Sequence, residues 1–160
     1  TIRSRSIRLP LNPLSTEDTL RVLHELPSEA LGAKLEHLEQ AATLSKGSPG
    51  RALELHVSKG ASVFAEFSRL ARLSPAACAE IASHFDLRTP AEDFYVFCDL
   101  LSGWVTAQAR DAALQGRGEA LAGGADDIIS SIRQADALNL DRRQTVTDAL
   151  MRLEEALKAS

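Results

Sequence analysis

The stretch that decides the fold is residues 89–114, TPAEDFYVFCDLLSGWVTAQARDAAL. Pro90 suits the first position of a helix, and Glu92 and Asp93 follow where the positive end of the helix dipole favours acids. Apolar residues then recur at helical spacing on one face, and others lie on the remaining faces: Phe94, Phe97, Leu101, Trp104 and Val105, then Tyr95, Val96 and Leu100. The pattern predicts a long helix over 90–114, surrounded by partners at the centre of a helical module.

Composition supports an all-α fold for the whole chain. The 160 residues are 44% apolar and 25% charged, with a net charge of −4. Alanine and leucine supply most of the apolar side chains, and the β-branched residues that favour strands are scarce. Because no apolar run approaches the roughly 18 residues of a membrane span, we expect no membrane partner and a cytoplasmic location.

The cysteines and the single methionine carry two further expectations, one about the redox compartment and one about where the chain starts. The two cysteines, Cys78 and Cys98, lack CxxC spacing, which predicts buried thiols in a reducing compartment rather than a disulfide scaffold. The only methionine is Met151, so we expect Thr1 not to be a natural start and the chain to be a piece of a longer protein.

The first third of the chain reads as a stub of strand followed by three helices. Alternation predicts a short strand over 7–9, which Pro10 ends. Helices are predicted over 15–25, 28–44 and 48–58, the last with Ser48 as N-cap and Pro49 in the first turn. We expect Gly60 to cap the third helix at its C-terminus.

The remainder is predicted to hold five longer helices. The first follows Gly60 with a face through Val63 and Phe67, and the second runs from Ser74-Pro75 to about Asp86. After the helix over 90–114, the glycine-rich residues 115–124 read as a loop. Further helices are expected over 126–137 and from an Asp141 N-cap to Lys158, following an Asn139-Leu140-Asp141 turn.

Several kinds of catalytic site are not indicated. None of the four lysines lies in a GxxxxGK[ST] phosphate-binding loop, and the four histidines lack HExxH spacing. A zinc site needs three or four convergent ligands, which the sequence does not suggest. No GxSxG segment marks a nucleophilic serine. We therefore expect neither a metal nor a complete active site, and no enzyme activity of this chain by itself.

Three segments carry the remaining functional information. Residues 1–8, TIRSRSIR, place three arginines together, and they read either as a solvated basic end or as a source of charge for a phosphoryl group. Residues 46–53, KGSPGRAL, read as a loop and helix cap, or as a means of directing Arg51 at a phosphate. Residues 137–144, ALNLDRRQ, read as a tight turn between helices.

Together these segments resemble the clamp-loader branch of the AAA+ proteins. Residues 1–9 are similar to the "SRC" segment that closes the family's ATPase core, and residues 47–53 are similar to the sensor-2 region of its lid. The resemblance covers the whole chain in order. It implies the end of an ATPase core at 1–9, a three-helix lid at 10–60 and a five-helix collar at 61–160.

The resemblance also implies a function. The family assembles five subunits through their collars and loads a ring-shaped sliding clamp onto primed DNA. Arg5 matches the family's arginine finger, which reaches the ATP of a neighbouring subunit, and Ser4 matches the serine before it. Ser6 replaces the usual cysteine. Arg51 matches the sensor-2 arginine, a nucleotide-binding residue. The arginine-finger match implies ATP at the neighbouring subunit, and no cofactor is expected in this chain.

Two other interpretations stay open. The chain could belong to an ATP-hydrolysing motor subunit of the same loader, whose phosphate-binding loop would lie before Thr1. It could also be an unrelated helical adaptor whose arginines are merely solvated.

Overall fold

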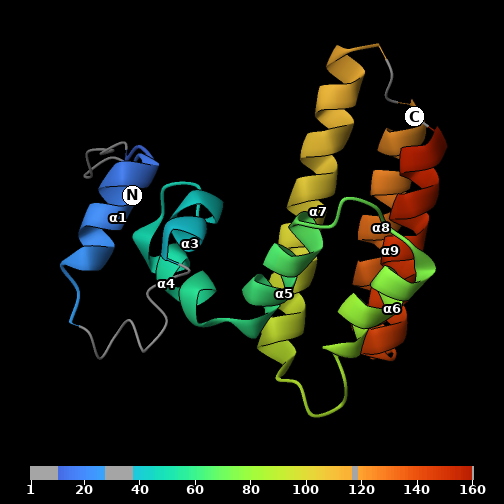
Figure 1. The fold of residues 1–160 in the computed structure, drawn as a ribbon, viewed down its shortest axis with the longest axis horizontal. Coiled ribbons are helices and arrows are strands. Elements are labelled where there is room, and N and C mark those ends of the chain that lie inside the picture. Colours follow the sequence, from blue (N-terminus) through green and yellow to red (C-terminus); the bar gives the residue numbers. More distant parts are fainter. Residues whose placement is uncertain (1–10, 28–37, 117–118, 160) are drawn as a thin grey trace, which may run out of the picture. The chain divides into compact units, whose positions relative to one another are not determined.

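The computed structural model describes residues 11–27, 38–116 and 119–159. Within those ranges the regular structure consists of α-helices, without a strand, which confirms the all-α expectation (Figure 1). The strand expected over 7–9 lies outside the described residues. The chain divides into two compact units, residues 1–57 and 58–160, which are described separately.

The first unit contains three described helices around a small apolar core. These helices are α1 (Thr16–His24), α3 (Leu38–Leu44) and α4 (Pro49–Val57). Leu23, Leu38, Ala42 and Ala52 are buried together where the three helices meet. The helices predicted over 15–25 and 48–58 are confirmed. Of the helix predicted over 28–44, the structure describes only the last part, which is α3.

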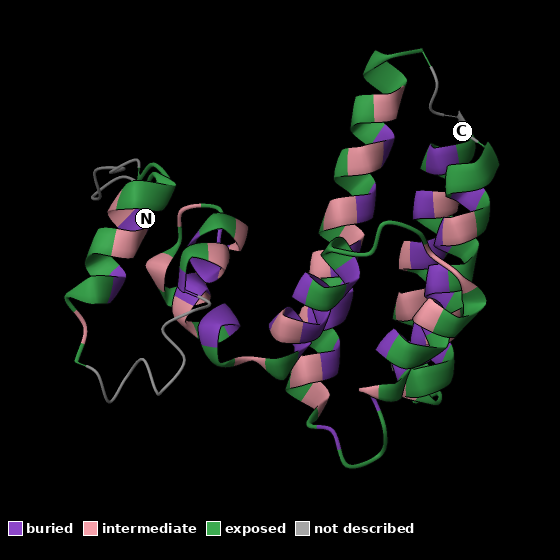
Figure 2. Cartoon of the chain, in the orientation of Figure 1, coloured by how far each residue is buried: buried purple, intermediate pink, exposed green. Residues whose placement is uncertain are grey.

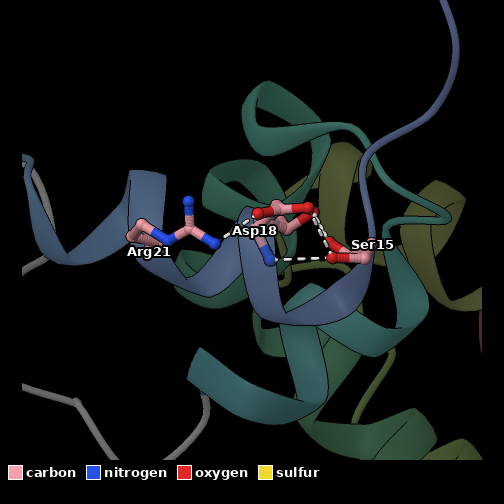
Figure 3. Close-up of polar contacts among 4 residues, drawn as sticks. Ser15, Asp18 and Arg21 are labelled. Atoms are coloured by element: carbon pink, nitrogen blue, oxygen red, sulfur yellow. Dashed lines mark hydrogen bonds and ion pairs between the residues drawn. The ribbon is translucent and has the colours of Figure 1, made fainter.

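Helix α1 begins as its sequence predicts, with Ser15 as the N-cap (Figure 3). The backbone N–H of Asp18 donates to the Ser15 hydroxyl oxygen at 3.0 Å, which satisfies one of the unpaired amides of the first turn. The Asp18 carboxylate in turn pairs with Arg21 one helical turn later. The cap therefore fixes where the chain leaves its extended conformation.

The turn before α4 depends on a glycine. Lys46 and Gly47 have φ angles of 53° and 82°, in the left-handed region that glycine enters without steric cost. The backbone N–H of Leu14 donates to the Gly47 carbonyl oxygen at 3.0 Å, so the segment before α1 lies against this turn. A Cβ atom on Gly47 would be only 2.4 Å from the Leu14 carbonyl oxygen. Both φ and space therefore require glycine here.

The second unit is a bundle of five helices. They are α5 (Lys59–Ser68), α6 (Pro75–Ser83), α7 (Ala91–Leu114), α8 (Glu119–Ala137) and α9 (Arg142–Ala159). Helix α7 packs mainly on α5 and α8, while α9 packs mainly on α8 and α6 (Figure 1). The long helix is present as predicted. It is not enclosed on all sides, however, because Tyr95 is 47% exposed.

Aromatic rings from three segments form the centre of this bundle. Phe97 of α7 meets Phe85 with ring centroids 4.9 Å apart, and Phe67 of α5 meets Trp104 edge to face at 5.3 Å. Buried residues line the facing sides of the helices (Figure 2). Cys78 and Cys98 are both buried, as predicted, and burial raises the pKa of the Cys78 thiol. A raised thiol pKa makes the nucleophilic thiolate scarce, so Cys78 acts as a small core residue.

The expectation that Gly60 caps a helix is wrong. Gly60 is buried inside α5, near its N-terminus, and does not have a positive φ angle. Its role is steric, because the backbone of Asp93 on α7 passes close to its Cα atom. The cap of α5 is Ser58, whose hydroxyl oxygen accepts a hydrogen bond from the Ala61 N–H.

The expected loop over 115–124 is also wrong in its second half. Helix α8 already begins at Glu119 and includes both Gly123 and Gly124. A Cβ atom on Gly124 would lie 2.6 Å from the Cβ atom of Ala156, so the glycine lets α8 and α9 approach closely. This close approach to α9 offsets the low helix propensity of Gly124.

Candidate functional site

Of the three sequence-predicted site residues, the structure describes only Arg51. Ser4 and Arg5 lie outside the described residues. Arg51 is in the first turn of α4, where its backbone N–H donates to the Ser48 hydroxyl oxygen at 3.4 Å. Its guanidinium pairs with the Glu54 carboxylate at 3.1 Å, and the Arg51 side chain is 32% exposed. Arg51 is therefore accessible at the start of a helix.

A second candidate site lies in the larger unit, starting with the loop between α6 and α7. Asp86 organises this loop, because its Oδ1 atom accepts hydrogen bonds from the backbone N–H groups of Arg88 at 2.9 Å and Thr89 at 3.0 Å. The Thr89 hydroxyl lies 2.7 Å from the His84 carbonyl oxygen and 3.1 Å from the Asp86 Oδ1 atom, and its one proton is shared between these two acceptors. The hydrogen bond from the Arg88 N–H, followed by that from the Thr89 hydroxyl, holds the pKa of Asp86 below its ordinary value.

The turn between α8 and α9 forms the other half of this site. The N–H of Leu140 donates to the Ala135 carbonyl oxygen at 2.9 Å, and Asn139 between them has φ of 50°. This is the arrangement of a Schellman helix end, in which asparagine can replace the usual glycine. Asp141 then caps α9 by accepting from the Gln144 N–H at 2.8 Å, as predicted.

Arg142 joins the loop to the turn. Its Nη1 atom donates to the Thr89 carbonyl oxygen at 2.9 Å, and its guanidinium lies 5.8 Å from the centroid of the Phe94 ring. A guanidinium over an aromatic face is attracted by the ring quadrupole. Two segments far apart in sequence are thus fastened at the same end of the bundle (Figure 1).

We call residues 85–89 and 138–142 together the loop–turn surface. A cavity of about 300 Å³ lies in it, lined by residues from both segments: Phe85, Asp86, Leu87, Asn139, Leu140, Asp141 and Arg142. Three leucines are unusually exposed for their type, namely Leu87 at 96%, Leu138 at 61% and Leu140 at 52%. Exposed apolar side chains gathered beside a cavity are typical of surfaces that bind other proteins.

The polar side chains of the loop–turn surface are engaged in holding the backbone. The carboxylates of the loop–turn surface are used as backbone acceptors, and no serine, cysteine or histidine lines its cavity. Among the described residues, no group of three or more histidine, cysteine, aspartate or glutamate side chains could hold a metal ion. In the same part of the chain, no helix combines the length and apolar character that crossing a membrane requires.

Of the two segments of the loop–turn surface, only one is predicted from the sequence. The sequence predicts the Asn139-Leu140-Asp141 turn, whereas over 85–89 it predicts only the end of one helix and the start of the next. The available signal was Asp86 three residues before Thr89-Pro90, a spacing at which a carboxylate can accept from the loop's own amides. That Arg142 would reach Thr89 could not be read from the sequence, because the two are brought together only by packing.

Comparison of the chain with protein-family models, with curated proteins and with solved structures gives no match.

Proposed function

We propose that this chain is the lid and collar portion of the delta-prime subunit of a bacterial replicative clamp loader. In that role it contributes no active site of its own. It assembles with the gamma/tau and delta subunits, and the assembled complex binds the sliding clamp and primed DNA. The ATP belongs to the neighbouring subunit.

The observation that carries the proposal is the order of the two helical units. A small unit, with Arg51 in the first turn of α4 after Gly47-Ser48-Pro49, precedes a larger unit of five helices. This is the order that the sequence resemblance to clamp-loader proteins implies for a lid and a collar. The exposed leucines of the loop–turn surface agree with a module that binds other subunits.

The mechanism follows from the charge of arginine. Arg5 would reach the γ-phosphate of ATP on the adjacent motor subunit, where its permanently charged guanidinium stabilises charge on the transferring phosphoryl group. A group supplied in trans makes hydrolysis depend on assembly. Ser4 would position the segment that carries Arg5.

The test is a reconstituted loader with Arg5→Ala in this subunit. We expect clamp- and DNA-stimulated ATP hydrolysis to fall at least about tenfold while the complex still assembles, since arginine fingers contribute large factors to phosphoryl transfer. Arg8→Ala, a charge removal in the same segment, is the matched control and should leave the rate unchanged. Unchanged hydrolysis with Arg5→Ala would overturn the finger assignment.

Arg51→Ala tests the sensor-2 assignment separately. The exposed pair with Glu54 contributes at most about 0.5 kcal/mol to stability, and circular dichroism checks that the variant folds. A loss of nucleotide affinity in the complete subunit would then report a direct role in binding. Glu54→Ala is the control, because it breaks the same ion pair without removing the guanidinium.

The loop–turn surface also favours a second candidate, a helical adaptor outside any loader. Its exposed leucines suit a protein partner, and that partner need not be an ATPase. Mixing the chain with purified gamma/tau and delta subunits discriminates between the two, because a collar forms a stable complex with them and an unrelated adaptor does not. An intact GxxxxGK[ST] segment before Thr1 would instead favour the motor subunit.

A further inference from the structure

The chain passes from the first unit to the second through a very short junction. Helix α4 ends at Val57 and helix α5 begins at Lys59, which leaves Ser58 between them. The backbone of Ser58 is extended, with φ of −76° and ψ of 129°. Two helices joined by so short a segment change direction only through the torsion angles at that segment, which is how a hinge residue works.

Asp93, in the first turn of α7, holds this junction and the start of α5. Its Oδ1 atom accepts hydrogen bonds from the Ser58 hydroxyl at 2.9 Å, from the Lys59 N–H at 2.8 Å and from the Gly60 N–H at 3.2 Å. Two of these donors are amides that the start of a helix leaves without a partner, and the helix dipole favours a negative charge there. All four residues belong to the second unit, so this contact does not depend on the first.

We propose that Asp93 is a latch that confines the hinge between the two units to the bonds joining Val57 to Ser58. While the three hydrogen bonds are made, residues 58–60 move with the second unit, and the first unit turns only about ψ of Val57 and φ of Ser58. When they break, the first turn of α5 can unwind and its residues join the hinge. Asp93 thereby limits how far the two units can reorient. The proposal goes beyond the clamp-loader function and does not depend on it.

The latch is firm when closed and is able to open. Hydrogen bonds to an ionised group contribute more than bonds between neutral groups, and this carboxylate accepts three. Asp93 and Ser58 are only half-buried and Lys59 is exposed, so water can reach the groups that opening would release. Exposed backbone hydrogen bonds at a helix end are the first to open locally.

Limited proteolysis with trypsin tests whether Asp93 closes the latch. Trypsin cleaves after lysine and arginine, and Lys59 lies within the latch, with Arg51 and Arg69 as the nearest other sites. Cleavage requires the segment to leave its helix. In the 160-residue chain we expect Asp93→Ala to speed cleavage after Lys59 at least about tenfold. Asp93→Asn keeps an oxygen acceptor without the charge and should have a smaller effect.

Glu92→Ala is the matched control for both Asp93 variants. Glu92 is the neighbouring acid in the same first turn of α7 and is exposed, so its loss should leave cleavage after Lys59 unchanged. Cleavage after Arg152 of α9 reports the rest of the second unit and should accelerate less than cleavage after Lys59. Equal acceleration at Lys59 and Arg152 would show general unfolding and overturn the proposal. So would equal effects of Glu92→Ala and Asp93→Ala.

The range of the hinge is measured by double electron–electron resonance between two spin labels. Glu39→Cys in α3 and Glu155→Cys in α9 place a label at an exposed position in each unit. The two native cysteines are buried, so they react poorly with the label. We expect Asp93→Ala to broaden the distribution of label distances and Glu92→Ala to leave its width unchanged. A distribution that Asp93→Ala does not broaden would overturn the proposal, because Asp93 would then not limit the hinge.

Discussion

The carbonyl oxygen of Asp93 lies so close to Gly60 that a Cβ atom added to the glycine would be 1.9 Å from it. The same aspartate also fixes the start of α5, because its Oδ1 atom accepts from the Lys59 N–H at 2.8 Å and from the Gly60 N–H at 3.2 Å. The Ser58 hydroxyl donates to that oxygen at 2.9 Å. The first turn of α7 therefore holds the first turn of α5 at backbone contact distance.

Gly60→Ala should destabilise the second unit strongly. The opposing atoms belong to the backbone of α7 and cannot turn aside, so α5 must shift away from α7. We expect the free energy of unfolding to fall by about 1–3 kcal/mol, the usual cost of overpacking. Urea denaturation followed by circular dichroism measures it, and Trp104 fluorescence reports the same unit because Trp104 packs on Phe67 of α5.

Gly123→Ala is the matched control for that prediction. Gly123 is also a helical glycine in the second unit, but nothing lies within 4 Å of the position of its Cβ atom. Alanine there should raise the free energy of unfolding by roughly 0.5–1 kcal/mol through helix propensity. If Gly60→Ala and Gly123→Ala change the free energy of unfolding in the same direction, the close approach of Asp93 to Gly60 does not determine the effect of alanine at residue 60.

The helices could be predicted from the sequence because their signals are local. Ser15 and Ser74 act as N-caps, and the apolar spacing in α9 buries Val146 and Leu150 as predicted. Two of the wrong predictions involve glycine. Gly60 and Gly124 were read as breaks in helices, whereas each allows a close approach to another helix. A sequence shows that a residue lacks a side chain, but not which distant atom occupies the space.

The candidate site was less predictable for a related reason. Arg142 and Thr89 are 53 positions apart in the sequence, and only the packing of α9 against α6 brings their segments together. Asp141 was predicted as a cap because its partner, Gln144, is three residues away. Predictions for Ser4 and Arg5 rest on resemblance alone, since neither residue is among those described.

Removing the Asp86 carboxylate should destabilise the protein in a pH-dependent way. Backbone and hydroxyl hydrogen bonds hold its pKa below the ordinary value, so folding favours the charged form. The resulting stabilisation is fully present above the unfolded pKa of about 4. It is lost as the pH falls through the lower folded pKa. Asp86→Ala should therefore be less stable than the unchanged chain at pH 7, and the difference should shrink below about pH 4.

Urea denaturation of Asp86→Ala and of the unchanged chain between pH 3 and pH 7 checks the sign of this difference in stability. Asp126→Ala provides the comparison, because Asp126 is an exposed aspartate of α8 outside the loop–turn surface. A difference between Asp86→Ala and the unchanged chain that grows on acidification would contradict the role assigned to the Asp86 hydrogen bonds.

Arg142→Ala should loosen the attachment of α9 to the loop before α7. The variant loses a charged hydrogen bond to the Thr89 carbonyl oxygen and a cation–π contact with Phe94, and leaves that carbonyl without its partner. We expect a loss of about 1–3 kcal/mol in the free energy of unfolding. Arg142→Lys should recover only part of it, because lysine retains the charge but not the planar guanidinium that lies over the ring.

Arg143→Ala is the matched control. Arg143 is an exposed neighbour in the same turn of α9, so its substitution should change the free energy of unfolding by less than about 0.5 kcal/mol. Hydrogen exchange at the Thr89 amide locates the effect: faster exchange in Arg142→Ala than in Arg143→Ala assigns the loss to the loop, whereas equal rates would show that Arg142 does not hold it.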